Sequence, residues 1–317
     1  MENKVHLLVK NQNLLKDFDS IYGPYDGKVL SSFSPMVSLV EFAGRICYNS
    51  GRPNSKNRPT VEYFKHIIES KHYSIFGHWM KFFRIKNMKN FLNYISVHKR
   101  TYLRQDPNKN FYVILSLRHL IEDLENDTIS EVTRDLALAY KEFGIEAKYN
   151  KLLEIIPDKY SVIEPSDFLE NIYSFFIQTS RRTSLELLRH NTEYCVSQES
   201  TRYVSKGESK LVNEAMPIKL NPLDKILLNI VHNLSLYAYN HILNSYKTKD
   251  LLEKKTLRGF LSGYLLQDTD TVLVYTCTEY QFNCIKEQRL SQYADPNIRD
   301  LVEKMSKEVE KYGDAKL

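Results

Sequence analysis

Apolar residues recur along the chain in two patterns, a helical spacing of three or four residues and short continuous runs. The helical spacing predicts amphipathic helices. These are expected at residues 35–46, 59–68, 183–189, 222–238, 282–289 and 297–312. The short runs predict strands, because they are too brief for helices and rich in branched and aromatic residues. These are expected at residues 5–9, 80–85, 172–177 and 271–275.

Residues 86–170 are interpreted as mostly helical, with a charged part at 125–165 in which apolar positions are sparse. Residues 125–165 are expected to be helical decoration rather than a second core. No repeat, low-complexity tract or linker divides the chain. The sequence therefore predicts one α+β domain over residues 1–317 with helical insertions.

Composition narrows the class of protein. The 317 residues are 42% hydrophobic and 26% charged, and ten Gly and ten Pro are too few for a turn-dense all-β fold. The net charge of +5 suits a small anionic ligand at least as well as nucleic acid, and no long Lys/Arg run is present. No apolar stretch approaches the roughly 18–20 residues of a membrane span. Without a signal peptide, the four cysteines are expected to be reduced thiols in a cytoplasmic protein.

The clearest candidate chemistry lies in residues 189–203, which begin with Arg189-His190 and end with Ser200-Thr201-Arg202. Two guanidiniums and a hydroxyl in one loop would clamp an anion, since the planar donor fork of Arg fits phosphate. The simplest ligand is a nucleotide phosphate; a surface salt-bridge cluster is the alternative. The chain has no glycine-rich dinucleotide or phosphate-loop motif. It also lacks a His or Cys spacing typical of metal sites, so no structural metal is predicted.

Five blocks in the same order resemble the flavin-dependent thymidylate synthase family. Arg189-His190 and Ser200-Thr201-Arg202-Tyr203 fill the two ends of its Arg-His-Arg and Ser-x-Arg-Tyr motif, with a spacer one residue longer. The other blocks are the first strand with a helix ending Arg45-Ile46-Cys47-Tyr48-Asn49-Ser50, the loop His72-Tyr73-Ser74-Ile75-Phe76-Gly77-His78, Ser180-Arg181 before Leu187-Leu188-Arg189-His190, and Arg289-Leu290-Ser291-Gln292-Tyr293-Ala294 before Ile298-Arg299.

The resemblance implies a fold and an activity. The fold would be α+β, with a central, mostly antiparallel sheet flanked by helices and a helical insertion at about 86–170. Family members are homotetramers that bind FAD at subunit interfaces. They move a one-carbon unit from methylenetetrahydrofolate to C5 of dUMP, giving dTMP, with NADPH as the reductant and no Cys nucleophile. Neither a membrane nor nucleic acid is expected as a partner.

The resemblance also implies roles for single residues. Arg289 is the expected catalytic residue, contacting the pyrimidine and stabilising negative charge on its ring. Arg258 matches an arginine that a neighbouring subunit donates. The expected substrate-binding residues are Glu186, Arg189, Gln198, Ser200, Thr201, Arg202, Arg258 and Arg289. The expected flavin-binding residues are His72, Ser74, Arg189, His190, Asn191, Thr278, Tyr280 and Asn283.

Several of these positions depart from the family pattern. Asn191 replaces Arg, Gly77 replaces Glu, and Thr278 and Tyr280 stand where the family has Asn and Arg. Glu186 stands for Gln and Gln198 for Glu. A Glu/Gln exchange changes what a side chain can donate or accept. The chain could therefore methylate or hydroxymethylate another pyrimidine nucleotide, such as dCMP. A third hypothesis is a non-catalytic paralogue that binds nucleotides or nucleic acid by stacking on its 22 Tyr.

Overall fold

The computed structural model describes residues 3–16, 21, 34–48, 60–98, 101–141, 161–166, 169–189, 193–202, 206, 221–246, 250–266 and 269–312. The chain forms two compact units. Unit 1 comprises residues 1–8, 44–51 and 174–317, and unit 2 comprises residues 9–43 and 52–173.

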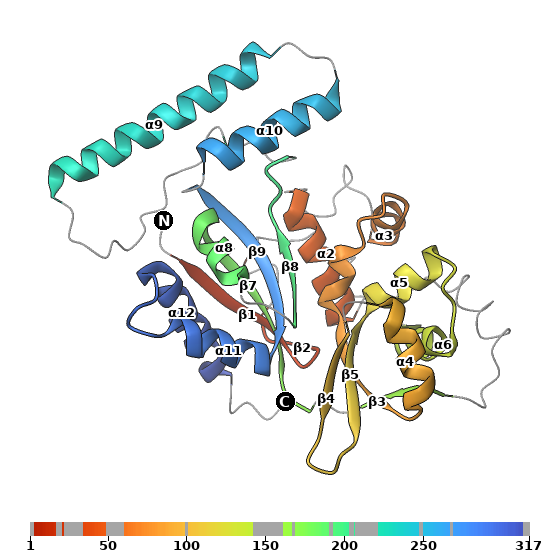
Figure 1. The fold of residues 1–317 in the computed structure, drawn as a ribbon. Helices are drawn as coiled ribbons and strands as arrows, with labels where there is room; N and C mark the ends of the chain where they lie inside the picture. The colour runs from red at the N-terminus through yellow and green to blue at the C-terminus, as the bar shows by residue number, and fades with distance from the viewer. Residues whose placement is uncertain are drawn as a thin grey trace. The chain divides into compact units, whose positions relative to one another are not determined.

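The elements follow one another as drawn in Figure 1. The strands are β1 (Lys4–Lys10), β2 (Asn13–Leu14), β3 (Met80–Ile85), β4 (Tyr102–Gln105), β5 (Phe111–Ser116), β6 (Ile163–Pro165), β7 (Ile172–Ser180), β8 (Tyr194–Gln198) and β9 (Asp270–Thr278). The helices are α2 (Pro35–Tyr48), α3 (Thr60–Glu69), the 3₁₀ turn η2 (Tyr73–His78), α4 (Met88–Val97), α5 (Leu117–Glu125), α6 (Glu131–Ala139), α8 (Arg181–Leu188), α9 (Pro222–Ser245), α10 (Leu251–Leu265), α11 (Glu279–Arg289) and α12 (Pro296–Lys311).

Two sheets organise these elements, and the predicted α+β class is confirmed. One sheet has the strand order β2-β1-β7-β9-β8 and the other β4-β5-β3-β6. Antiparallel pairing sets Tyr194 of β8 opposite Cys277 of β9, and Met80 of β3 opposite Ser116 of β5. In unit 1, helices α8 and α11 contact β9, and both contact α12. This packing places the ends of α8 and α11 close to each other.

The prediction that residues 86–170 are mostly helical is wrong in part. Strands β4, β5 and β6 lie in this stretch and form a sheet with β3. β5 is buried from Tyr112 onward, so its apolar run shows no strand alternation. The apolar run at the end of β5 joins the apolar residues of α5 without a break, so the sequence pattern does not separate the strand from the helix.

The prediction that residues 125–165 only decorate the fold is also wrong. Val132, Leu136 and Tyr140 are buried at or beside α6. The Tyr140 hydroxyl donates to the backbone oxygens of Trp79 (3.2 Å) and Leu115 (3.0 Å). A buried hydroxyl with two acceptors fixes the position of α6 on the sheet. The insertion is thus a packed α+β layer of unit 2.

The other predicted strands and helices are confirmed, with two changes near the motif. Helix α8 begins at Arg181 and is capped by Ser180, whose Oγ accepts from the Thr183 backbone N–H at 3.0 Å. The helix expected at residues 183–189 therefore begins two residues earlier, at Arg181. Residues 189–203 are not one loop either, because β8 lies between their two ends.

Helices α9 and α10 contact each other in unit 1 and share a small core. Tyr239, Leu261 and Leu266 are buried there. Most other apolar side chains of α9 remain exposed. The larger ones are Leu223, Ile226, Leu227, Leu228, Ile230, Val231, Leu234, Tyr237 and Ile242. None of the described helices is both long and apolar enough to span a membrane.

Candidate functional site

Two arginines converge on Glu186 in unit 1. Arg289, the last residue of α11, lies with Nη1 3.4 Å from Glu186 Oε2 and donates from Nη2 to the Glu186 backbone oxygen at 3.0 Å. Arg189, at the end of α8, lies 2.9 Å from Glu186 Oε1. A cation at a helix carboxyl end is favoured by the helix dipole. The Arg289 side chain is 15% exposed and the Arg189 side chain 65%, so Arg289 is held more firmly.

The segment from Ser200 to Arg202 forms a second cluster in unit 1. The Ser200 N–H donates to the Cys47 backbone oxygen at 2.8 Å, and the Arg202 N–H donates to Ser200 Oγ at 3.3 Å. Arg258 of α10 donates from Nη1 to the Arg202 oxygen at 3.5 Å. A Cβ on Gly259 would lie 2.8 Å from Arg202 Cγ, so the absent side chain lets α10 approach the Arg202 stem.

Arg202 and Arg258 therefore meet within one chain. Arg202 is exposed and Thr201 is half-buried, so both can be reached by a ligand. Donation of Arg258 by a neighbouring subunit stays a prediction. Among the described residues, no hydrogen bond or ion pair joins this cluster to Arg289. The expectation that positions 202 and 289 surround one ligand also stays a prediction.

A buried ion pair lies beside the Ser200 segment, and sequence reasoning missed it. Lys206 Nζ pairs with the Glu199 carboxylate and donates to the Asp270 backbone oxygen at 2.8 Å. The Lys206 side chain is 4% exposed. Burial lowers the pKa of Arg181, and the charge of Glu199 opposes that shift. The one available signal was a carboxylate directly before Ser200, because Lys206 reads as an ordinary surface lysine.

Gln198 joins β8 to α8. Its amide nitrogen donates to Ser184 Oγ at 2.9 Å and to Thr271 Oγ1 at 3.2 Å. The amide thus fixes the strand that leads to Ser200 against the helix that carries Glu186. A carboxylate at position 198 could only accept from these hydroxyls. The family's Gln and Glu have exchanged places here, and each new side chain has a defined partner.

The residues expected at a flavin differ in their accessibility. Thr278 is fully buried and caps α11, and its hydroxyl donates to Glu193 Oε2 at 2.9 Å. Tyr280 is 50% exposed and Asn283 is also exposed, one helical turn apart on α11. With Arg189 they offer a ring, an amide and a cation, which fit a flavin cofactor. His190 and Asn191 lie outside the described residues.

The remaining expected flavin residues belong to unit 2. His72 and Ser74 are exposed at the start of η2. Partial burial lowers the pKa of His72, and the neighbouring His66 lowers it further. His72 is therefore neutral at pH 7, when its ring can both donate and accept a hydrogen bond.

Cys47 contacts the Ser200 segment through its backbone oxygen. Burial raises the pKa of its thiol to about 11, although hydrogen bonds with Ser197 and the backbone oppose the shift. A thiol with this pKa is protonated at neutral pH and is a poor nucleophile. Within the described residues, no group of three or more His, Cys, Asp or Glu side chains is placed to hold a metal ion.

Comparison with known protein families gives a match to the second half of the chain. Residues 159–312 match the model of the family described as "Thymidylate synthase complementing protein". This range contains Glu186, Arg189, Ser200, Arg202 and Arg289.

Two curated relatives match shorter segments. One is the "Probable flavin-dependent thymidylate synthase" of Mycobacterium phage D29, 40% identical over 62 residues, which are 19% of this chain and 26% of that protein. The other is the flavin-dependent thymidylate synthase of Mycobacterium avium (strain 104), 50% identical over 42 residues, 13% of this chain and 17% of that protein. The chain thus matches about a quarter or less of the length of these two relatives.

Among solved structures, thymidylate synthase X from Helicobacter pylori with FAD and dUMP aligns at 18% identity. The alignment covers 61% of this chain and 84% of that one, with a TM-score of 0.33.

Proposed function

We propose that the chain is a member of the flavin-dependent thymidylate synthase family and a methyltransferase-type enzyme that acts on a pyrimidine nucleotide. The reaction is FAD-dependent transfer of a one-carbon unit from methylenetetrahydrofolate to C5 of dUMP, giving dTMP. NADPH is the reductant. The observation that supports this most is Arg289, which is largely withdrawn from solvent and held in place by Glu186.

Arg289 is the catalytic residue in this proposal. Two of its nitrogens are fixed by Glu186, so the guanidinium is oriented before substrate arrives. Its positive charge stabilises the negative charge that develops on the pyrimidine ring as C5 becomes nucleophilic. A donor that needs no reorganisation, in a site with little water, is worth more than the same donor in bulk solvent.

The Ser200–Arg202 segment binds the substrate phosphate. Ser200 and Thr201 offer hydroxyls, and Arg202 and Arg258 offer guanidiniums. The contact between Arg258 and the Arg202 backbone keeps the two cations together, although they repel each other. A dianionic phosphate relieves that repulsion, so the cluster is suited to this ligand.

FAD, when bound, supplies the redox chemistry of the transfer. Tyr280, Asn283 and Arg189 are the described residues of unit 1 best suited to hold it, because each has a polar group that solvent reaches. His72, Ser74, His190, Asn191 and Thr278 stay as predicted contacts.

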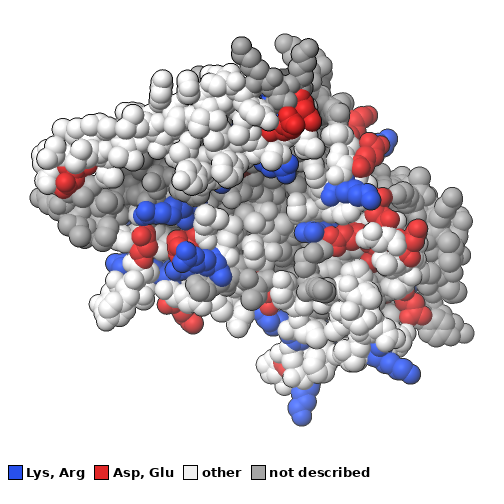
Figure 2. Space-filling view, turned by 45° about the horizontal axis from the view of Figure 1, so that its top comes forward, with Lys and Arg blue, Asp and Glu red and all other residues white. Residues whose placement is uncertain are grey.

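The exposed face of α9 supports a homo-oligomer, with a tetramer as the expected state. Val231, Leu234 and Tyr237 are 60%, 61% and 68% exposed, and α10 adds Phe260 and Tyr264 at 66% and 77%. In Figure 2, α9 forms a band with few charged side chains, whereas basic and acidic residues mix elsewhere on that face. Continuous apolar surface of this kind marks interfaces. The mixed charges do not favour nucleic-acid binding.

One observation favours dCMP as an alternative substrate. The Glu186 carboxylate lies against the arginine that would contact the base. Cytosine carries an amino group where uracil carries a carbonyl, and a carboxylate accepts from the first and repels the second. The alternative is therefore a flavin-dependent transfer to C5 of dCMP.

The test is an assay of the FAD-loaded protein with folate donor, NADPH and either dUMP or dCMP. The product is identified by mass. We expect dTMP from dUMP, and a loss of about 10²–10³-fold in Arg289→Ala from removing one charge-stabilising group. Lys286→Ala, on the same helix, is the control and should keep its rate.

The same assay separates the two substrates. If the wild-type protein makes product from dCMP but not from dUMP, and Glu186→Gln shifts its preference toward dUMP, then dCMP is the substrate and the dUMP assignment is wrong. A flavin-loaded protein that makes no product from either nucleotide would overturn the proposal.

A further inference from the structure

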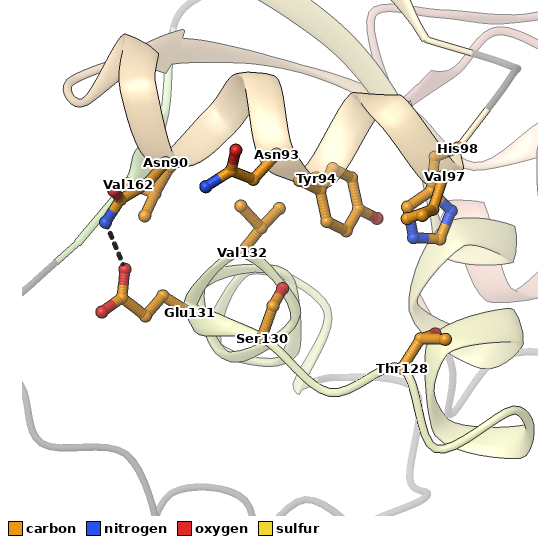
Figure 3. Close-up of a pocket in the computed structure, with 10 residues that line it drawn as sticks. All are labelled: Asn90, Asn93, Tyr94, Val97, His98, Thr128, Ser130, Glu131, Val132 and Val162. Carbon is orange, nitrogen blue, oxygen red and sulfur yellow. Dashed lines mark hydrogen bonds between the residues drawn. The ribbon is translucent and has the colours of Figure 1, made fainter.

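A cavity of about 460 Å³ lies in unit 2, outside the family-matched residues apart from Val162. Figure 3 shows Asn93, Tyr94 and His98, along α4 and at its end, facing Ser130, Glu131 and Val132 at the start of α6. A volume of several hundred Å³ is that of a small-molecule site. Nothing in the proposed reaction uses these residues.

One buried carboxylate holds the walls of the cavity together. Asp123 of α5 has no exposed surface. Its Oδ2 accepts from the Tyr94 hydroxyl at 3.2 Å and from Thr133 Oγ1 at 2.9 Å. Its Oδ1 accepts from Thr128 Oγ1 at 3.2 Å and lies 2.8 Å from His98 Nε2.

These partners come from α4, from the loop after α5 and from α6. The Tyr94 and His98 rings also stack, with centroids 4.1 Å apart. A satisfied polar network of this kind rigidifies the elements that it joins. The cavity is therefore shaped before any ligand binds, which is what a binding site requires.

The polar and apolar groups that line the cavity indicate which kind of ligand it would bind. Asn90 donates to Glu131 Oε2 at 2.8 Å, so its amide oxygen and the Glu131 carboxylate remain as acceptors. The Asn93 carboxamide makes no hydrogen bond to any other described residue, and it can donate and accept. Val97, Val132 and Val162 supply apolar wall. The lining suits a molecule with an apolar body and N–H donors on its edge.

Charge excludes phosphate from this cavity. Among the described residues that line it there is no Lys or Arg, and Glu131 is acidic. His98 cannot supply a free positive charge, because Asp123 faces it. An anion would therefore meet a carboxylate without a compensating cation.

We propose that this cavity binds an uncharged, amino-bearing heterocycle of nucleoside size, with its amino group donating to Glu131 and its ring edge paired with the Asn93 carboxamide. Carboxamide side chains pair in this way with bases that carry an amino group beside a ring nitrogen. The site is a second one, separate from the nucleotide site proposed above and independent of it.

The test is calorimetric titration of the full-length protein with deoxycytidine and deoxyadenosine, and with thymidine and dCMP for comparison. We expect saturable binding of at least one of the amino-bearing nucleosides and weaker binding of thymidine. Val97→Trp should weaken that binding at least tenfold by filling the cavity. Leu92→Trp, at an exposed position of the same helix that does not line the cavity, should leave it unchanged.

Two further variants keep the test decisive. Asn93→Leu removes the carboxamide at an exposed position and should weaken binding even if Val97→Trp folds poorly. Arg289→Ala should not affect it, which separates this site from the proposed active site. Absence of saturable binding by either amino-bearing nucleoside, binding indifferent to both cavity variants, or tighter binding of dCMP at the Val97-sensitive site would overturn the proposal.

Discussion

The candidate active site of unit 1 and the insertion cavity of unit 2 satisfy their charged groups in different ways. In unit 1, the Arg189 and Arg202 side chains are exposed. Helix α9, which follows them in the chain, also has most of its larger apolar side chains exposed to solvent. In the insertion, Asp123 is fully buried with four partners from its own unit. In our proposal, the first region is completed by a ligand and by other subunits. The second is complete within one chain.

The largest effect should come from charging the exposed apolar face of α9. Val231→Glu combined with Leu234→Glu places two carboxylates where we expect another subunit, and burying unpaired charge costs several kcal/mol per group. We expect sedimentation to show dissociation to smaller species and the dUMP assay to lose nearly all activity. Asn229→Glu with Asn233→Glu adds the same charge to exposed polar positions and is the matched control. An unchanged sedimentation coefficient would mean that α9 is not the interface.

The next largest effect should come from removing the buried Asp123 carboxylate of unit 2. Asp123→Leu should lower the free energy of unfolding by about 3–5 kcal/mol, because it leaves His98, Tyr94 and two threonine hydroxyls without their shared acceptor. Urea unfolding followed by circular dichroism measures this. Glu69→Leu, at an exposed position of α3 in the same unit, is the control. A loss below about 1 kcal/mol would show that the network contributes little, and the contrast with unit 1 would weaken.

The reactivity of the Cys47 thiol tests whether the buried residues that contact the Ser200 segment stay closed to solvent in the folded protein. Its thiol pKa is about 11 in the folded chain against an ordinary value of 9.0. The thiolate is the reactive form, and its fraction falls about tenfold for each unit by which the pKa rises. At pH 8 we therefore expect iodoacetamide to modify Cys47 about 100-fold more slowly in the native than in the urea-unfolded protein, as read by peptide mass.

The sign of the pH dependence follows from the same shift. The folded state favours the protonated thiol, so its contribution to stability is complete below pH 9 and is lost as pH rises through about 11. Native reactivity should rise over that window. Half-buried Cys284 of α11 serves as an internal reference thiol. Equal native and unfolded rates at pH 8 would show that the Ser200 segment opens readily.

The sequence offered a motif for the candidate site but no pattern for the strands in residues 86–170. Arg289, Ser200 and Arg202 could be predicted as site residues because a motif fixes residue type and spacing together, and their roles stay predictions. The departure at Glu186 was visible, and the structure shows its partners. Lys206 was missed because a buried ion pair formed by chain folding leaves no local pattern. Strand β5 was missed because burial on both faces removes the alternation that marks a strand.

The stripe on α9 shows another limit of sequence reasoning. Its spacing predicted the helix at Pro222 correctly. The same spacing of apolar residues is found in a helix that packs on its own chain and in a helix that packs on another copy, because both need one apolar face. Only the structure shows that Val231 and Leu234 lie outside the core of unit 1.

The smallest expected effect tests the close approach between α10 and Arg202. Gly259→Ala puts a methyl group 2.8 Å from Arg202 Cγ, so that flexible side chain must move. We expect KM for dUMP to rise about two- to fivefold with kcat unchanged, because Arg202, the proposed phosphate-binding residue, shifts and Arg289, the proposed catalytic residue, does not. Stability should not fall, since Ala is favoured over Gly inside a helix by about 1 kcal/mol. Gly263→Ala, one turn along the same helix with nothing within 4 Å, gains the same propensity without touching Arg202. If both variants raise KM equally, the effect comes from α10 itself, and Arg202 is not positioned by this contact.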